Sequence, residues 1–93
     1  MRKVIIYQEN NPMFRIDPDK DYSKLEGYQK VYEHDYNVDK DFDDEEFLEI
    51  LFEAFNRGNY PEDYKGHSMS VADIVDLDGR LWLCDSIGWT RIK

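Results

Sequence analysis

The sequence predicts an α+β domain in which one main amphipathic helix packs on a small antiparallel sheet. Runs rich in β-branched and aromatic residues occur near both ends of the chain. Residues 43–57 have helical periodicity, and Asp78-Gly79 is typical of a two-residue hairpin turn. Because 93 residues leave room for one hydrophobic core, we expect a single acidic α+β domain over residues 1–93.

The N-terminal third predicts a strand followed by a loop. Residues 3–7 are β-branched and aromatic and end before a turn-forming Asn-Asn-Pro, so they form the first strand. Residues 14–16 either extend this strand or open another. Residues 17–27 combine an early proline, mixed charge and a final glycine, which predicts a loop with one helical turn.

Residues 28–36 predict a second strand, because their tyrosines lie at even spacing. Strand alternation places one set of side chains on a single face and Val31 on the other. The members of that set are Tyr28, Lys30, Tyr32, His34 and Tyr36.

Residues 43–57 predict the main helix. Its apolar side chains form one broad stripe, and the opposite side carries charged residues at spacings of three or four. Asp43 or Asp44 is expected to cap the first turn, and Gly58 to end the helix. The stripe consists of Phe47, Leu48, Leu51, Phe52, Ala54 and Phe55.

The C-terminal third predicts a loop at residues 59–66 and then three strands. Alternation in residues 69–77 indicates a strand, although Asp73 falls on its apolar face. Residues 80–84 form the return strand of the hairpin, and residues 89–92 form a short last strand.

One stretch resembles a known family. Residues 66–75 read Gly-His-Ser-Met-Ser-Val-Ala-Asp-Ile-Val, and residues 84–89 read Cys-Asp-Ser-Ile-Gly-Trp. Over about residues 59–93 this order is similar to the C-terminal half of the YodL-like domain family. The resemblance implies an origin in conjugative elements or phages, in a setting that includes anti-restriction functions. It implies no catalytic residues.

His67, Ser68, Ser70 and Asp73 include the residue types of a hydrolase triad, but there is no Gly-x-Ser-x-Gly elbow. The structural interpretation is more economical: the serines bond to local backbone, and Asp73 fastens the hairpin or its neighbouring loop. Cys84 lies in an apolar strand and is expected to be a buried, inert thiol. We therefore expect a protein without enzymatic activity.

The charge balance limits the classes of partner. Asp and Glu number 21 against 12 Lys and Arg, giving a net charge of -9, so direct nucleic-acid binding is not expected. A single cysteine excludes an intramolecular disulfide and fits a reducing, cytoplasmic location. We expect no signal peptide or membrane span, because no apolar run is long enough. We also expect no cofactor, since EF-hand-like spacings fail at their glycine and glutamate positions and neither a zinc spacing nor a phosphate loop occurs.

Charge density is highest between residues 33 and 49, which contain nine acidic residues and one basic residue, Lys40. One interpretation is a solvated face that keeps a small protein soluble. The other is a mimic of the nucleic-acid backbone that blocks a basic groove of a host nuclease, such as a CRISPR effector or restriction enzyme. The expected contact residues are the carboxylates Glu33, Asp35, Asp39, Asp41, Asp43, Asp44, Glu46, Glu49 and Glu53, with Tyr32 and Tyr36 as aromatic anchors. Tyrosines on a sheet face are equally consistent with positions in the core.

A second hypothesis is an accessory module of a conjugative element. It docks on another protein through its sheet or through the loop at residues 60–66, without inhibiting anything. Under this hypothesis, binding depends on Tyr60, Tyr64 or Trp89 rather than on the carboxylates. In either case we expect a monomer or small homo-oligomer.

Overall fold

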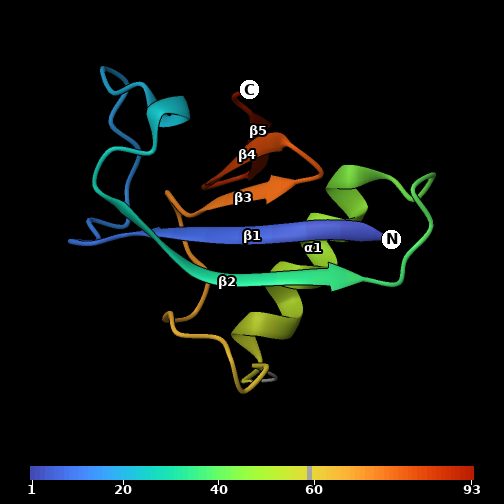
Figure 1. Ribbon diagram of the computed structural model, residues 1–93. Helices are drawn as coiled ribbons and strands as arrows, with labels where there is room; N and C mark the ends of the chain where they lie inside the picture. Colours follow the sequence, from blue (N-terminus) through green and yellow to red (C-terminus); the bar gives the residue numbers. More distant parts are fainter. Residues whose placement is uncertain (59) are drawn as a thin grey trace.

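A computed structural model describes residues 1–58 and 60–93, and within them it confirms the expected α+β fold. A five-stranded antiparallel sheet has the order β2-β1-β3-β4-β5, and the helix α1 covers one of its faces (Figure 1). Asn59, the first residue of the expected loop, lies outside the described residues. The elements are β1 (Arg2–Glu9), the 3₁₀ turn η1 (Tyr22–Lys24), β2 (Tyr28–Tyr36), α1 (Asp44–Asn56), β3 (Ile74–Leu77), β4 (Arg80–Asp85) and β5 (Gly88–Arg91).

β1 is an interior strand of the sheet, next to the edge strand β2, although it comes first in the chain. It pairs with β2 on one side and with β3 on the other, so Ile6 faces both Tyr32 and Val75. The even residues Val4 and Ile6 are completely buried under α1. An interior position for residues 2–9 makes the first strand part of the core rather than a sheet edge.

A β-bulge in β2 corrects the expected aromatic face. The pairing moves from Ile6 with Tyr32 to Tyr7 with Lys30, so Val31 is the extra residue. An extra residue reverses the alternation beyond it. Val31 and Tyr32 therefore both lie in the core beneath α1, whereas Tyr28 packs on the opposite face of the sheet.

The helix is confirmed at both ends. The Asp43 carboxylate accepts a hydrogen bond from the Glu46 amide at 3.2 Å, as an N-cap does, and Gly58 follows the C-cap with φ of +80°. Four of its side chains are buried against the sheet: Phe47, Leu48, Leu51 and Phe55. The helix is too short and polar to span a bilayer, and no other described helix does so.

The segment between β1 and β2 covers part of the other face of the sheet (Figure 1). There a second cluster of buried side chains forms around Tyr22, Ile74, Leu81 and Leu83. The expected helical turn is η1, whose N-cap Asp21 accepts from the Ser23 amide. Residues 14–16 form no strand, because Phe14 has φ of +57°, which breaks an extended backbone.

The strand expected from residue 69 begins only at Ile74, and this too is a correction. Ala72 has φ of +80°, and the Ala72 amide and the Asp73 carbonyl beside this kink both pair with Cys84 of β4. Ala72 donates to the Cys84 carbonyl, and Cys84 donates to the Asp73 carbonyl. The hairpin at Asp78-Gly79 is confirmed, with φ of +53° and +89°.

Candidate partner-binding surface

The acidic tract does not form one surface, because β2 alternates. Its residues Tyr32 and His34 lie opposite Ile6 and Val4 on the face beneath α1, so Glu33 and Asp35 point to the other side of the sheet. There Glu33 forms ion pairs with Lys3 at 3.0 Å and Lys30 at 2.8 Å. These two lysines lower the pKa of Glu33, the Lys30 hydrogen bond most. Glu33 and Asp35 are thus separated from the carboxylates of the helix.

Asp44 acts inside the molecule rather than on its surface. It forms ion pairs with Arg2, which is completely buried, and with Arg80, at 2.7 Å between Oδ2 and Nε. The Arg80 hydrogen bond, together with Arg2, lowers the pKa of Asp44 to about 2. Arg2 also donates to Asp78 Oδ2 at 2.9 Å and to the Phe42 carbonyl at 2.6 Å. This network joins the first turn of α1 to β1 and to the β3–β4 hairpin.

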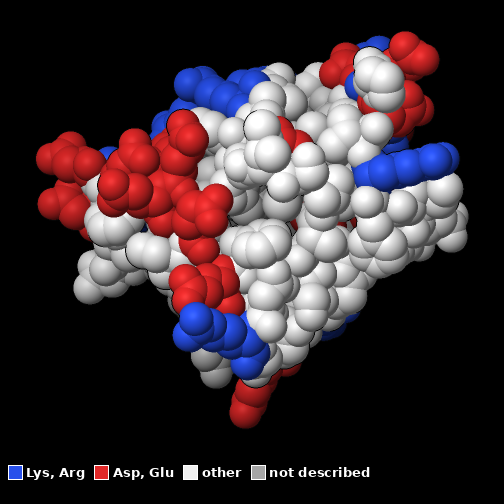
Figure 2. Space-filling view, turned by 180° about the vertical axis from the view of Figure 1, so that it is seen from behind, with Lys and Arg blue, Asp and Glu red and all other residues white. Residues whose placement is uncertain are grey.

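Six exposed carboxylates remain on the helix side, and we call them the acidic surface: Asp39, Asp41, Asp43, Glu45, Glu46 and Glu49. Within the described part of the chain none of the six forms an ion pair, whereas Glu53 pairs with Arg57 one turn further on. Figure 2, which views the molecule from the side of α1, shows acidic side chains gathered at one end of this face and uncharged side chains over much of the rest. Glu45 belongs to the densest acidic run of the sequence, but it is not among the expected contact residues.

Tyr32 is a core residue and Tyr36 packs against the core, which corrects their expected role as surface anchors. Tyr32 is 4% exposed, and its ring meets Phe55 edge to face at 5.5 Å. Tyr36 is half-buried and packs against Phe47 at 5.6 Å. Their hydroxyls bond to each other at 3.0 Å. The bulge and the helix together place both rings between α1 and the sheet.

The Gly-His-Ser motif forms a structural strap. Gln8, 1% exposed, donates to Asp73 Oδ2 at 2.9 Å and accepts from the His67 amide at 3.1 Å. A Cβ on Gly66 would lie 2.1 Å from Gln8 Oε1, so the close approach of this backbone requires glycine. Asp73 also accepts from the Ser70 amide at 2.9 Å, which confirms that it fastens the neighbouring loop.

The same strap does not assemble a catalytic triad. His67 Nδ1 contacts the Ser68 carbonyl, and Asp73 bonds to Gln8 and Ser70 rather than to His67. Contrary to expectation, neither serine side chain bonds to the local backbone of the described residues. Ser68 Oγ bonds to the Tyr60 hydroxyl at 2.7 Å, and Ser70 Oγ is buried with no partner among the described residues. The nucleophile-to-base contact that such a triad needs is missing from this part of the chain.

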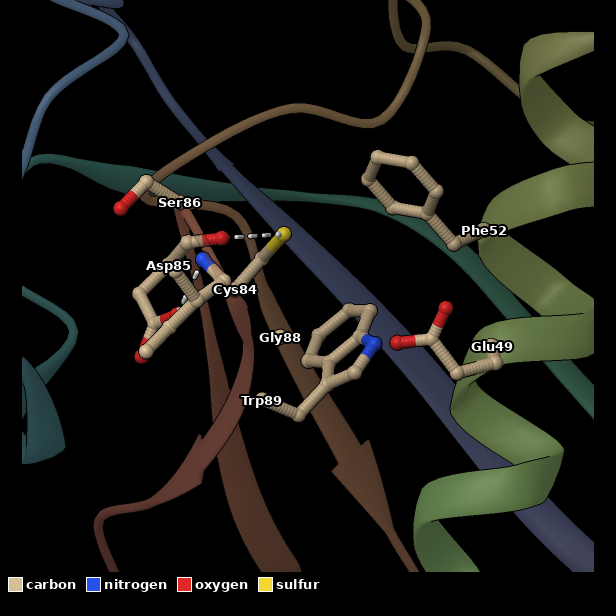
Figure 3. A pocket seen from close by; sticks show the side chains of 8 residues that line it. Glu49, Phe52, Cys84, Asp85, Ser86, Gly88 and Trp89 are labelled. Atoms are coloured by element: carbon tan, nitrogen blue, oxygen red, sulfur yellow. Dashed lines mark hydrogen bonds between the residues drawn. The ribbon is translucent and has the colours of Figure 1, made fainter.

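A pocket lies between α1 and the turn that joins β4 to β5. Its volume is about 240 Å³. Figure 3 shows Glu49 and Phe52 reaching from α1 toward Trp89 of β5. The rings of Phe52 and Trp89 meet edge to face at 6.4 Å. Ile87, at the tip of the turn, also lines the pocket and is 96% exposed. An apolar residue placed at a tight Asp-Ser-Ile-Gly turn was the signal in the sequence for this site.

Cys84 forms part of the pocket wall but is 4% exposed, and burial raises the pKa of its thiol to about 12. We therefore expect native protein at about pH 8 to react with a disulfide reagent about a thousandfold more slowly than unfolded protein, since thiolate is the reactive form. The release of the reagent's chromophore, with and without guanidinium, measures this ratio. A native thiol that reacts as fast as the unfolded one would contradict the prediction.

The comparisons place the chain in a family. The YodL-like domain matches residues 4–93, so the chain belongs to the YodL-like domain family over essentially its whole length, and not only over residues 59–93. The chain is also similar to a protein of Acanthamoeba polyphaga mimivirus named "Uncharacterized protein R785", with 33% identity over 100% of this chain and 94% of that protein. No solved structure matches it significantly. A YodL-like domain with a viral relative fits an origin in mobile elements or viruses.

Proposed function

We propose that this protein is a non-enzymatic inhibitor carried by a virus, phage or plasmid, and that its acidic surface blocks a basic, nucleic-acid-binding groove of a host nuclease. Such a nuclease is a CRISPR effector or a restriction enzyme, and the inhibitor itself uses no cofactor. The observation that supports the proposal most is that the six carboxylates of the acidic surface are exposed and lack ion pairs within the described chain. An uncompensated acidic surface raises the rate of encounter with a cationic partner.

The fold supports this role by holding the charges in place. Asp43 caps α1, and Asp44 fixes its first turn to two arginines. Glu45, Glu46 and Glu49 therefore project from a helix whose start is anchored to the sheet. An anchored helix backbone loses less conformational entropy on binding than a flexible segment does, so more of the attraction remains as affinity.

The alternative is an accessory docking module without inhibitory activity. One observation favours it: Tyr60 is 41% exposed, stacked on Tyr64, in the loop where docking was expected. Tyr64 itself packs on Phe55 and donates to the His67 carbonyl, so it belongs to the fold. Replacing Tyr60 by serine is the better test, because binding that depends on Tyr60 and not on charge indicates docking.

Charge reversal tests the inhibitor. Asp41→Lys combined with Glu45→Lys is expected to slow association with a captured nuclease at least about tenfold at low salt, because steering scales with local charge. Asp19→Lys combined with Glu26→Lys makes the same change in net charge in the segment that covers the opposite face, where both carboxylates are exposed. This control is expected to change the rate less than about twofold. Thermal unfolding of each variant checks that the fold is kept.

The nuclease is found by capture on immobilised protein from host lysate and is identified by mass spectrometry. Support requires three results: release of the nuclease by salt, competition with its guide RNA or DNA, and loss of cleavage in the presence of the protein. Equal slowing by the reversal and its control would overturn the proposal, as would inhibition that survives the reversal.

A further inference from the structure

The turn between β4 and β5 stands between two apolar hollows. The pocket beside α1 is lined by Phe52, Trp89 and Ile87, and a hollow of about 510 Å³ on the other side is lined by Phe14, Ile16, Val71 and again Ile87. Phe14 is 57% exposed and Ile87 96% exposed. Apolar side chains that border continuous hollows, rather than lying singly, are typical of sites of interaction.

Side-chain hydrogen bonds hold this turn in spite of its exposure. Asp85 Oδ1 accepts from the Ile87 amide at 2.9 Å, and Asp85 Oδ2 accepts from the Thr90 hydroxyl at 2.6 Å. These two hydrogen bonds lower the pKa of Asp85, the one from Thr90 most. The turn therefore holds the backbone at Ile87 in place, which reduces the entropic cost of contact with a partner.

The charge at the pocket indicates the kind of partner. Glu49 lines the pocket, is exposed, and has no ion pair within the described chain. Figure 3 shows its carboxylate beside the indole of Trp89. Glu45 and Glu46 lie one turn before it on α1. Because Glu49, Phe52 and Trp89 line the same pocket, a partner that places an apolar side chain against the two rings brings a cation on a neighbouring residue to Glu49.

We infer that this pocket binds a protein segment in which a leucine-sized apolar side chain is flanked by lysine or arginine. The apolar side chain enters the pocket, packs against Phe52 and Trp89 and contacts Ile87, and the flanking cation pairs with Glu49. The inference deepens the proposed function, because it adds an apolar anchor to the basic partner. It is tested with a peptide alone, so it stands or fails independently of whether that partner is a nuclease.

The probe is the capped peptide Lys-Arg-Leu-Arg-Lys, compared with Lys-Arg-Ser-Arg-Lys and with a peptide in which citrulline and norleucine replace its cations. The indole N–H resonance of Trp89, assigned by its loss in Trp89→Phe, reports on the pocket. We expect a saturable shift with the leucine peptide and at least about fivefold weaker binding by each of the other two peptides. Equal binding of the leucine and serine peptides would overturn the inference, because charge alone then explains it.

Matched variants locate the contact. Ile87→Ser and Glu49→Gln change exposed side chains outside the core. Each is expected to weaken binding of the leucine peptide about three- to tenfold. Ile50→Ser removes an apolar side chain of α1 that is 55% exposed and lies outside the pocket, so no change is expected. Equal weakening by Ile50→Ser and Ile87→Ser would contradict the assignment. A Trp89 shift that depends on protein concentration without peptide would also contradict it, because a second copy would then occupy the pocket.

Discussion

Replacing Arg2 by methionine is expected to destabilise the fold by about 3–5 kcal/mol, because it leaves Asp44 and Asp78 partly buried without their shared cation. Arg2 is completely buried and donates to both carboxylates and to the Phe42 carbonyl. Methionine fills a similar volume, so the loss of stability reports on charge and hydrogen bonds rather than on a cavity. Denaturant unfolding followed by tryptophan fluorescence measures the free energy of unfolding.

Two comparisons make the Arg2 prediction specific. Arg80→Met removes the other cation at Asp44, but Arg80 is about a third exposed, so a smaller loss is expected. Lys40→Met, on the exposed loop before α1, is expected to change stability by less than about 0.5 kcal/mol. If Arg2→Met unfolded no more readily than Lys40→Met, the network would have no role in anchoring α1.

The same network predicts a loss of stability in acid. The pKa of Asp44 is lowered from 3.8 to about 2 in the folded protein, so its contribution is complete above about pH 4 and is lost as the pH falls to about 2. This contribution is about 2 kcal/mol. In Arg2→Met the dependence of stability on pH over that window is expected to be shallower.

Replacing Asp73 by alanine is expected to cost about 2–3 kcal/mol at about pH 8, because the Ser70 amide and the buried Gln8 amide lose their acceptor. Asparagine offers one oxygen to both donors, so the free energy of unfolding of Asp73→Asn is expected to be close to that of the wild type. Comparison of the two variants separates the hydrogen bonds from the charge. Equal stability of the alanine and asparagine variants would show that the strap does not need this acceptor.

The charge of Asp73 has a pH dependence opposite to that of Asp44. Burial raises the pKa of Asp73 from 3.8 to about 6, in spite of its hydrogen bonds. The folded state therefore binds the proton more tightly than the unfolded state, and stability rises as the pH falls from about 7 to about 4. Relative to Asp73→Asn, the wild type is expected to gain about 2–3 kcal/mol over that range. A constant difference between the two proteins would mean that Asp73 stays ionised.

The elements could be predicted because their signals are local. The helix at residues 44–56 has its apolar stripe, an aspartate at the N-cap and a glycine after the C-cap within one segment. The hairpin at Asp78-Gly79 needs positive φ at two adjacent residues, which that dipeptide favours. β-Branched and aromatic composition identified β1, and the even spacing of the tyrosines identified β2, although the bulge at Val31 changes which face of β2 lies in the core.

The features that could not be predicted depend on pairing between segments distant in the chain. The sheet order places β1 between β2 and β3, and the pairing with β1 makes Val31 a bulge, so Tyr32 joins the core although its spacing matches Tyr28. The register also turns Glu33 away from α1. Asp44 looks like its acidic neighbours in the sequence, but two arginines 42 and 36 residues away neutralise it. The sequence by itself determined the elements and the acidic charge, because these depend on neighbours along the chain. The tertiary structure decided which carboxylates reach solvent, because that depends on long-range pairing.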